Sequence, residues 1–179
     1  MRLRLAFVVM LLAGTAGCIL STGQVMIAYE LPSPVRVAGA DALVAMQVNL
    51  DEIQSYRDHK SGLKDLADIA LLGSIANGST GDPIDLEVWL TRASTQLQEV
   101  TQVREQGIPI WGGQRVEADE VRRLDWDDSA KLVYESGRQA LLEEARGDGS
   151  FTLYFIDRAS IYDFTISEGA LVLVLDTDL

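Results

Sequence analysis

The chain has 179 residues, of which 47% are hydrophobic and 23% charged, and this composition excludes an intrinsically disordered protein. The formal net charge is −12 at pH 7, so we expect the chain to bind neither nucleic acid nor anionic lipid headgroups directly. The single cysteine excludes an intramolecular disulfide, and the single histidine, His59, excludes a histidine-based catalytic triad or a multi-histidine zinc site within one chain.

The first 17 residues have the three-part organisation of a secretory signal peptide. Arg2 and Arg4 precede a run of nine apolar residues at 5–13, and small residues follow at 14–17. The apolar run is shorter than the roughly 20 residues that a transmembrane helix needs, so the transmembrane alternative is disfavoured. Removal of residues 1–17 would leave 162 residues, long enough for one domain with a core, with a net charge of −14 because Arg2 and Arg4 carry the only charges of this segment.

The only cysteine directly follows this segment, in the sequence Thr15-Ala16-Gly17-Cys18. These four residues resemble the lipobox of bacterial lipoproteins, with Thr15 at a position where that family usually has leucine. The resemblance implies cleavage before Cys18, which then carries a diacylglyceryl thioether and usually an amide-linked acyl chain. One acyl chain anchors a protein marginally, whereas two or more hold it stably in a membrane. An unmodified reactive thiol is the alternative for Cys18.

The same resemblance bears on which membrane holds the anchor. In lipoproteins of double-membraned bacteria, an aspartate directly after the cysteine commonly causes retention in the inner membrane. Ile19 occupies that position here and therefore favours the outer membrane. Residues 18–23 then form a short lipidated tether, and residues 24–179 form a single domain.

Strand signals dominate the beginning of this domain. Residues 24–31 form an apolar run that ends at Pro32 and Pro34, and shorter strands are predicted at 35–37 and 42–50. The spacing of the apolar residues then changes from that of a strand to that of a helix. Asn49, followed three residues later by Glu52, has the form of a capping box, which predicts a helix over 51–61.

Two longer runs, at 67–76 and 84–93, are joined by the polar sequence NGSTGDP. In the second run, apolar residues at 84, 86, 88 and 90 alternate with Asp85, Glu87, Trp89 and Thr91. A period of two is typical of a strand with one buried face and predicts an antiparallel hairpin. This arrangement is weakly similar to β-sandwich domains of the immunoglobulin-like or late-embryogenesis-abundant type. The similarity implies a sandwich fold.

The second half of the chain predicts a helix followed by three strands. Residues 94–106 are compatible with an edge strand or a helix, and residues 108–113 are expected to be irregular. The helix is predicted at 129–146, with Asp127 and Asp128 at the positive end of its dipole. The strands are predicted at 151–157, 161–166 and 170–176, separated by turns at 158–160 and 167–169. The fold class is therefore β-rich α+β, an antiparallel β-sandwich with two helical insertions.

Trp89 is the one candidate binding residue. It alternates with the apolar positions of its run and therefore shares the outward face with Asp85, Glu87 and Thr91. A large apolar ring gains little among carboxylates unless something covers it. A helix of the same chain is one cover, and a partner protein or ligand is the other.

No residue pattern nominates a catalytic site, and we expect no metal and no cofactor. The densest acidic cluster, at 125–128, fails the calcium-loop pattern because its sixth and twelfth positions hold Ala130 and Ser136, so we interpret it as a helix N-terminus. Two function classes stay open. The first is a non-enzymatic, membrane-anchored lipoprotein that binds an envelope protein or glycan or supports an envelope assembly. The alternative is a carboxylate-based hydrolase such as a glycosidase, for which carboxylates are too numerous to nominate a pair.

Overall fold

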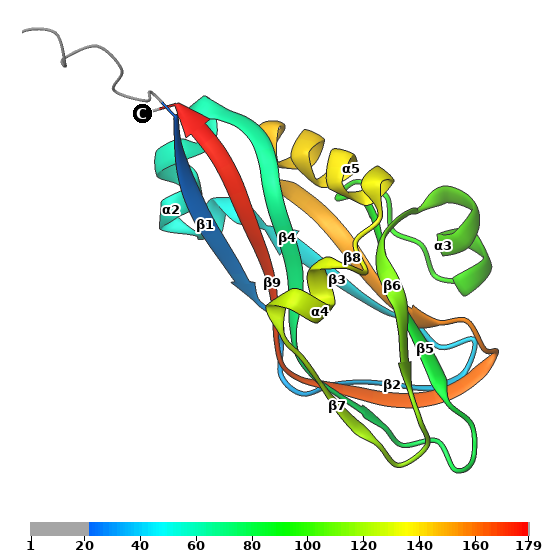
Figure 1. The fold of residues 1–179 in the computed structure, drawn as a ribbon. Coiled ribbons are helices and arrows are strands. Elements are labelled where there is room, and N and C mark those ends of the chain that lie inside the picture. The colour runs from blue at the N-terminus through cyan, green and yellow to red at the C-terminus, as the bar shows by residue number, and fades with distance from the viewer. Residues whose placement is uncertain (1–21, 179) are drawn as a thin grey trace, which may run out of the picture.

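The computed structural model describes residues 22–178, and they form two antiparallel sheets packed face to face (Figure 1). In the first sheet the order is β1 (Thr22–Glu30), β9 (Ile161–Asp178), β4 (Leu63–Asn77) and β7 (Val121–Leu124), and β2 (Val35–Ala40) also pairs with β9. In the second sheet the order is β3 (Val44–Asn49), β8 (Ser150–Asp157), β5 (Ile84–Arg92) and β6 (Ile108–Val116). The predicted β-rich α+β sandwich is confirmed.

Helices occupy three connections between strands rather than the predicted two. The first holds α2 (Gln54–His59) between the 3-10 turns η1 (Leu50–Glu52) and η2 (Lys60–Gly62), and the second holds α3 (Val100–Gln106). The third holds α4 (Trp126–Ala130) and α5 (Glu135–Arg146). The alternative of a helix within residues 94–106 is therefore the correct one.

Both predicted long helices are interrupted, each for a local reason. Asn49 does cap the first one, since its side chain accepts a hydrogen bond from the Asp51 N–H at 3.0 Å, but the turn it starts is 3-10 and Ile53 is extended. In the second, residues 131–134 leave the helix to pair with the edge of β6. The Gly112 N–H donates to the Leu132 carbonyl at 3.1 Å, and the Tyr134 N–H donates to the Ile110 carbonyl at 3.0 Å. These bonds satisfy part of an otherwise open sheet edge.

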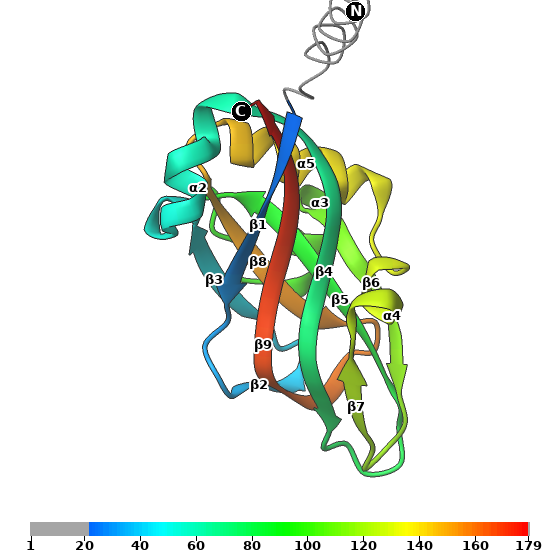
Figure 2. The same cartoon turned by 60° about the vertical axis from the view of Figure 1, so that its left-hand side comes forward.

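The predicted hairpin between the two central runs is wrong. Both runs are strands, β4 and β5, but they lie in different sheets: β4 pairs with β7 and β9, whereas β5 pairs with β6 and β8. Figure 2 shows β4 in the nearer sheet and β5 in the sheet behind it. Alternation identifies which face of a strand is buried but not which strand lies beside it, so the connecting turn was free to cross between the sheets.

Two expected irregular segments are strand. Residues 108–113 belong to β6, an edge strand, where Pro109 is tolerated because sheet edges do not need every N–H. The turn expected at 167–169 is an irregularity inside the 18-residue β9, with Glu168 at φ 53° opposite a register shift in β4. β9 continues through it and pairs first with β2 and then with β1.

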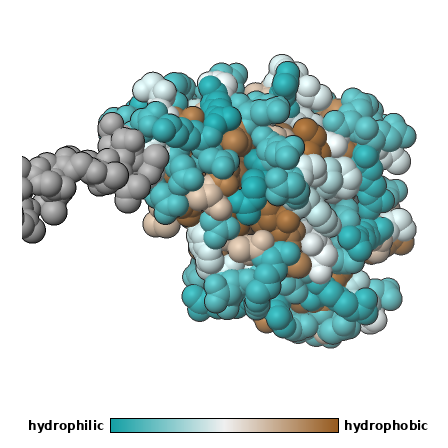
Figure 3. All heavy atoms as spheres, turned by 45° about the horizontal axis from the view of Figure 1, so that its top comes forward, coloured by the Kyte–Doolittle hydropathy of each residue, from teal (hydrophilic) through white to brown (hydrophobic). Residues whose placement is uncertain are grey.

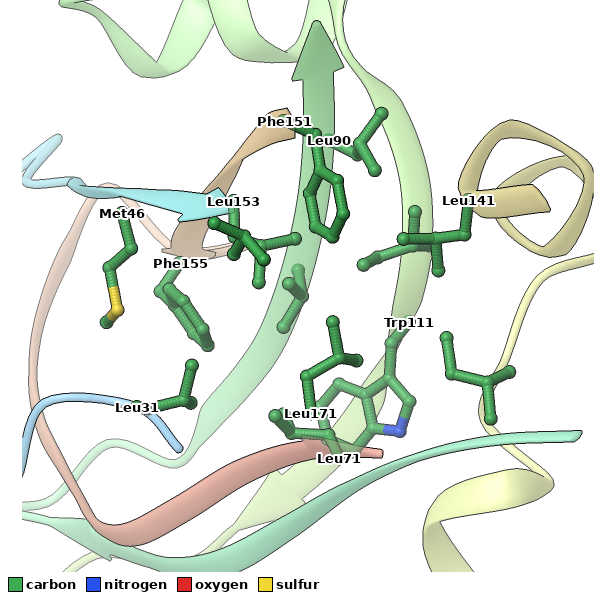
Figure 4. Packing of buried hydrophobic residues seen from close by; sticks show 14 of the residues in the cluster. Leu31, Met46, Leu71, Leu90, Trp111, Leu141, Phe151, Leu153, Phe155 and Leu171 are labelled. Atoms are coloured by element: carbon green, nitrogen blue, oxygen red, sulfur yellow. The ribbon is translucent and has the colours of Figure 1, made fainter. Parts of the chain in front are cut away.

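The main core lies between the two sheets (Figure 4). Phe151, Leu153 and Phe155 extend into it from β8, Trp111 enters from β6, and Leu141 reaches it from α5. All five side chains are at most 2% exposed. The core therefore includes the inner face of α5, which closes one side of the sandwich.

None of the helices within residues 22–178 is both long enough and apolar enough to cross a membrane. The face of the domain drawn in Figure 3 is mainly hydrophilic, with smaller apolar areas between polar side chains. Cys18, the proposed lipidation site, and the predicted signal peptide lie outside the described residues.

Candidate functional site

Trp89 lies on the outer face of the second sheet, beneath α3. Its neighbours along β5 that point inward belong to the main core, whereas Trp89 packs against a separate apolar cluster. That cluster joins the sheet to the β5–α3 connection and to α3 itself, and its buried members are Leu97, Val100, Val103, Tyr154 and Ile156. The ring is half-buried against this cluster. Of the two covers considered for Trp89, the structure therefore provides the helix of the same chain.

Trp89→Ala is expected to lower the free energy of unfolding by about 2 kcal/mol, less than the 3–5 kcal/mol typical of a fully buried ring, because the side chain is half-buried. Trp89→Phe is the matched control, since it keeps an aromatic ring beneath α3 while it removes the pyrrole part of the indole and the N–H that donates to Glu87. Urea unfolding followed by circular dichroism measures both. A change within about 0.5 kcal/mol for Trp89→Ala would contradict internal cover and indicate an ordinary surface site.

Next to Trp89, one arginine holds two carboxylates of β5. The Arg158 guanidinium contacts Glu87 Oε1 through Nε at 2.7 Å and Asp85 Oδ2 through Nη1 at 3.1 Å. The second oxygen of Glu87 accepts the Trp89 indole N–H at 3.1 Å. The hydrogen bond to Glu87 raises the pKa of Arg158 above its ordinary value. Trp89 therefore lies among carboxylates, as predicted, and one cation from the β8–β9 turn offsets part of their negative charge.

Asp157 is the most deeply buried carboxyl of this cluster, with 1% of the residue exposed. One oxygen accepts the Ala159 N–H at 2.6 Å, and the other accepts the Asp85 N–H. Burial raises the pKa of Asp157 above its ordinary value, and the nearby Asp85 and Glu87 add to this shift, against the two backbone hydrogen bonds. Arg104 of α3 also donates to the Asp157 carbonyl at 2.7 Å, so the cluster fastens α3 to the end of β8.

Two of the three carboxyl groups in this cluster are fully hydrogen-bonded within the domain. Glu87 and Asp157 each use both carboxylate oxygens, whereas Asp85 Oδ1 is buried and has no hydrogen-bond partner among the described residues. The sequence placed Asp85 and Glu87 on this face but did not identify Asp157, Arg104 or Arg158. The pair Asp157-Arg158 at the end of an apolar strand was the available signal.

The acidic cluster at 125–128 acts as the predicted helix N-terminus. The Asp125 carboxylate accepts the Asp128 N–H at 2.9 Å, which caps α4, and Asp127 and Asp128 lie in the first turn. Its role in the described structure is therefore to begin a short helix.

Two adjoining hollows, of about 310 and 220 Å³, lie between the end of β5 and the C-terminal half of α5. Arg92, Glu143 and Glu144 line both, and we call the pair the acidic groove. Asp148 lines the larger hollow. Arg92 Nε contacts Glu144 Oε1 at 3.3 Å. Burial raises the pKa of Glu144 and outweighs the opposing effect of Arg92. With three carboxyl groups and one guanidinium, the acidic groove suits a basic segment of a partner.

A third hollow, of about 400 Å³, lies on the outer face of the second sheet beside the β5–α3 connection. Its lining contains three glutamines, and we call it the amide groove. The six lining residues are Ala45, Gln47, Gln96, Leu97, Gln98 and Thr152. None of them is charged, which distinguishes the amide groove chemically from the acidic groove.

The comparisons with known proteins do not assign a family. No protein-family model matches the chain, and no curated protein matches it. Among solved structures, the chain is similar to one of mud crab tombus-like virus, with 13% identity, a TM-score of 0.38, and coverage of 88% of this chain and 81% of that one. It is also similar to a structure of Desmodium yellow mottle tymovirus, with 14% identity, a TM-score of 0.27, and coverage of 88% and 90%. Similarity at this level indicates no function for this chain.

Proposed function

We propose that the protein is a bacterial lipoprotein, anchored through acylated Cys18, whose β-sandwich is a non-enzymatic binding or envelope-assembly module at the outer membrane. One observation carries the proposal: a basic, apolar and small-residue segment leads directly into the only cysteine of the chain. The lipobox resemblance explains why that cysteine has no partner in the sequence, and its acylation provides a stable membrane anchor.

The position of β1 is compatible with such an anchor. β1 begins at Thr22, only four positions after Cys18, and pairs with the end of β9, so both lie at one end of the sandwich (Figure 1). The turns after β4 and β6 lie at the opposite end, where the Asn77 N–H donates to the Glu120 carbonyl at 2.9 Å. A lipid on Cys18 would hold the first end near the membrane and direct these turns away from it.

Binding is favoured over catalysis by the chemistry of the described surface. In the cluster of carboxylates around Arg158, Glu87 and Asp157 use both of their oxygens in hydrogen bonds within the domain, so neither presents a free oxygen to a substrate. The acidic groove and the amide groove instead present polar side chains to open hollows. An envelope protein with a basic segment, or a glycan, is the partner class that these hollows suit.

The proposal predicts complete loss of membrane attachment in Cys18→Ser. In a bacterial host, the unaltered chain is expected to incorporate an alkyne-labelled palmitate analogue and to fractionate with membranes, whereas Cys18→Ser does neither. Mass spectrometry of the N-terminal peptide should find the diacylglyceryl group on Cys18 and no residues from 1–17. Thr15→Leu, which introduces the residue usual in lipoproteins, should raise the processed fraction.

Ser21→Ala is the matched control, because it changes the tether without touching the motif, and it should label normally. An unmodified Cys18 thiol, or cleavage at any other bond, would overturn the lipoprotein assignment.

A further inference from the structure

We infer that the amide groove binds an uncharged, hydroxyl-rich ligand, the chemistry of a neutral oligosaccharide. This deepens the proposed function by naming a ligand class and rests on it for the biological setting. The volume of about 400 Å³ falls within the usual range of small-molecule sites, and it is the largest of the three hollows described above.

The walls of the amide groove come from two places in the fold. Gln47 of β3 and Thr152 of β8 are directly paired across the second sheet, and Gln96 and Gln98 flank Leu97 in the β5–α3 connection. Tyr154 fastens that connection to the sheet: its hydroxyl accepts the Leu97 N–H at 2.9 Å and donates to the Thr95 carbonyl at 3.1 Å. The backbone that presents the two glutamines is therefore held in place before any ligand arrives.

The polar groups of the amide groove have unused hydrogen-bonding capacity. The Thr152 hydroxyl is buried, the residue being 1% exposed, and it has no hydrogen-bond partner among the described residues. This oxygen has almost no accessible surface, so a ligand hydroxyl would reach it through an ordered water or after a small shift of the lining. The side-chain amides of Gln47, Gln96 and Gln98 also lack hydrogen bonds to other described residues, and each offers two donors and an acceptor. Paired donors and acceptors of this kind match the hydroxyl groups of a sugar.

The absence of charge in this lining selects among ligands. The chain is 23% charged and strongly acidic, yet none of the six residues carries a charge. A charged ligand would lose hydration there without gaining an opposite charge, whereas a neutral polar ligand loses little. Leu97 and Ala45 add apolar surface for the C–H faces of a sugar ring.

An extended peptide fits this place less well. β3 is the edge strand of its sheet, and a peptide would ordinarily add to such an edge through main-chain hydrogen bonds. The Gln47 carbonyl, however, already accepts the Tyr29 hydroxyl at 3.0 Å. The side chains of the amide groove are thus better placed for recognition than the edge of β3.

The test is titration of the full chain, in a zwitterionic detergent that contains no sugar, with chitotriose, a neutral trisaccharide bearing hydroxyl and acetamido groups. The ¹H–¹⁵N spectrum should show shifts of the glutamine side-chain amides of the groove. Gln47→Ala and Gln98→Ala should each weaken binding by about fivefold, the effect of losing one hydrogen bond. Both residues are exposed, so the fold should survive the changes.

Gln139→Ala, at an exposed glutamine of α5, is the matched control and should leave binding unchanged. Thr152→Val should weaken binding without lowering the unfolding midpoint, because it removes an unpaired buried hydroxyl. No shift of the groove amides with chitotriose, or an equal response to the neutral peptide Ac-Ala-Gln-Ala-NH₂, would overturn the inference. Cys18 takes no part in the titration, so failure here and failure of lipidation are separate results.

Discussion

Trp111→Ala is expected to lower the free energy of unfolding by about 4 kcal/mol, one of the two largest effects of a single substitution that we predict. Trp111 is 2% exposed and packs beside Leu71 and Leu171 in the core between the sheets (Figure 4). Its indole N–H donates to both the carbonyl and the hydroxyl of Ser129, each at 3.0 Å. Removing the ring leaves a cavity and deprives the carbonyl and hydroxyl of a buried serine of one hydrogen-bond donor.

The loss should extend beyond the ring because Ser129 joins three elements. Its hydroxyl also accepts the Leu71 N–H at 2.7 Å, so the contacts run from β6 through α4 to β4. Denaturant unfolding followed by circular dichroism measures the effect. Trp111→Phe keeps most of the buried ring and should cost only about 1–2 kcal/mol. Trp126→Ala, at a half-buried tryptophan of α4, is the second control, and a loss there equal to that of Trp111→Ala would argue against the core position of Trp111.

Gly137→Ala is expected to destabilise the domain by about 3 kcal/mol, although the same substitution at an exposed helix position stabilises by about 1 kcal/mol. Gly137 lies in α5 directly over β6. A Cβ atom added there would lie 2.8 Å from Ile110 Cβ and from the Pro109 carbonyl oxygen, and closer still to Ile110 Cα. Because two of these are backbone atoms of a paired strand, they cannot move aside cheaply.

For Gly137→Ala, the informative result is whether the free energy of unfolding falls or rises. Ser136→Ala, at the exposed neighbouring position of α5, controls for helix propensity and should change the free energy of unfolding by less than about 0.5 kcal/mol. Loss of thermal stability in Gly137→Ala should be accompanied by weaker hydrogen-exchange protection of the Tyr134 amide, which donates to the Ile110 carbonyl beside the contact. A stabilised Gly137→Ala variant would mean that α5 does not rest on β6 in this way.

Some features of the candidate sites follow from the local sequence pattern, and others depend on contacts between residues distant in the sequence. Alternation along β5 predicted that Trp89 faces outward with Glu87, and it predicted the need for a cover. It did not predict that the cover is α3, or that Arg158 and Asp157 come from a strand end about 70 positions away. The amide groove had no sequence signal, because Gln47, Gln96 and Thr152 lie far apart in the chain and are ordinary polar residues.

The sequence by itself indicated the strands other than β6 and β7, showed that the acidic residues at 125–128 begin a helix, and placed Cys18 directly after a signal-peptide-like segment, since these features depend on neighbouring residues and on the spacing of apolar residues. Only the tertiary structure decided that β4 and β5 belong to opposite sheets, that residues 131–134 leave a helix to pair with β6, and that β9 passes straight through its expected turn. The physical reason is that an apolar face tells which side of a strand contacts the core but not which strand pairs with it. Strand pairing is settled by packing and backbone hydrogen bonds between residues distant in sequence, which outweigh local preference.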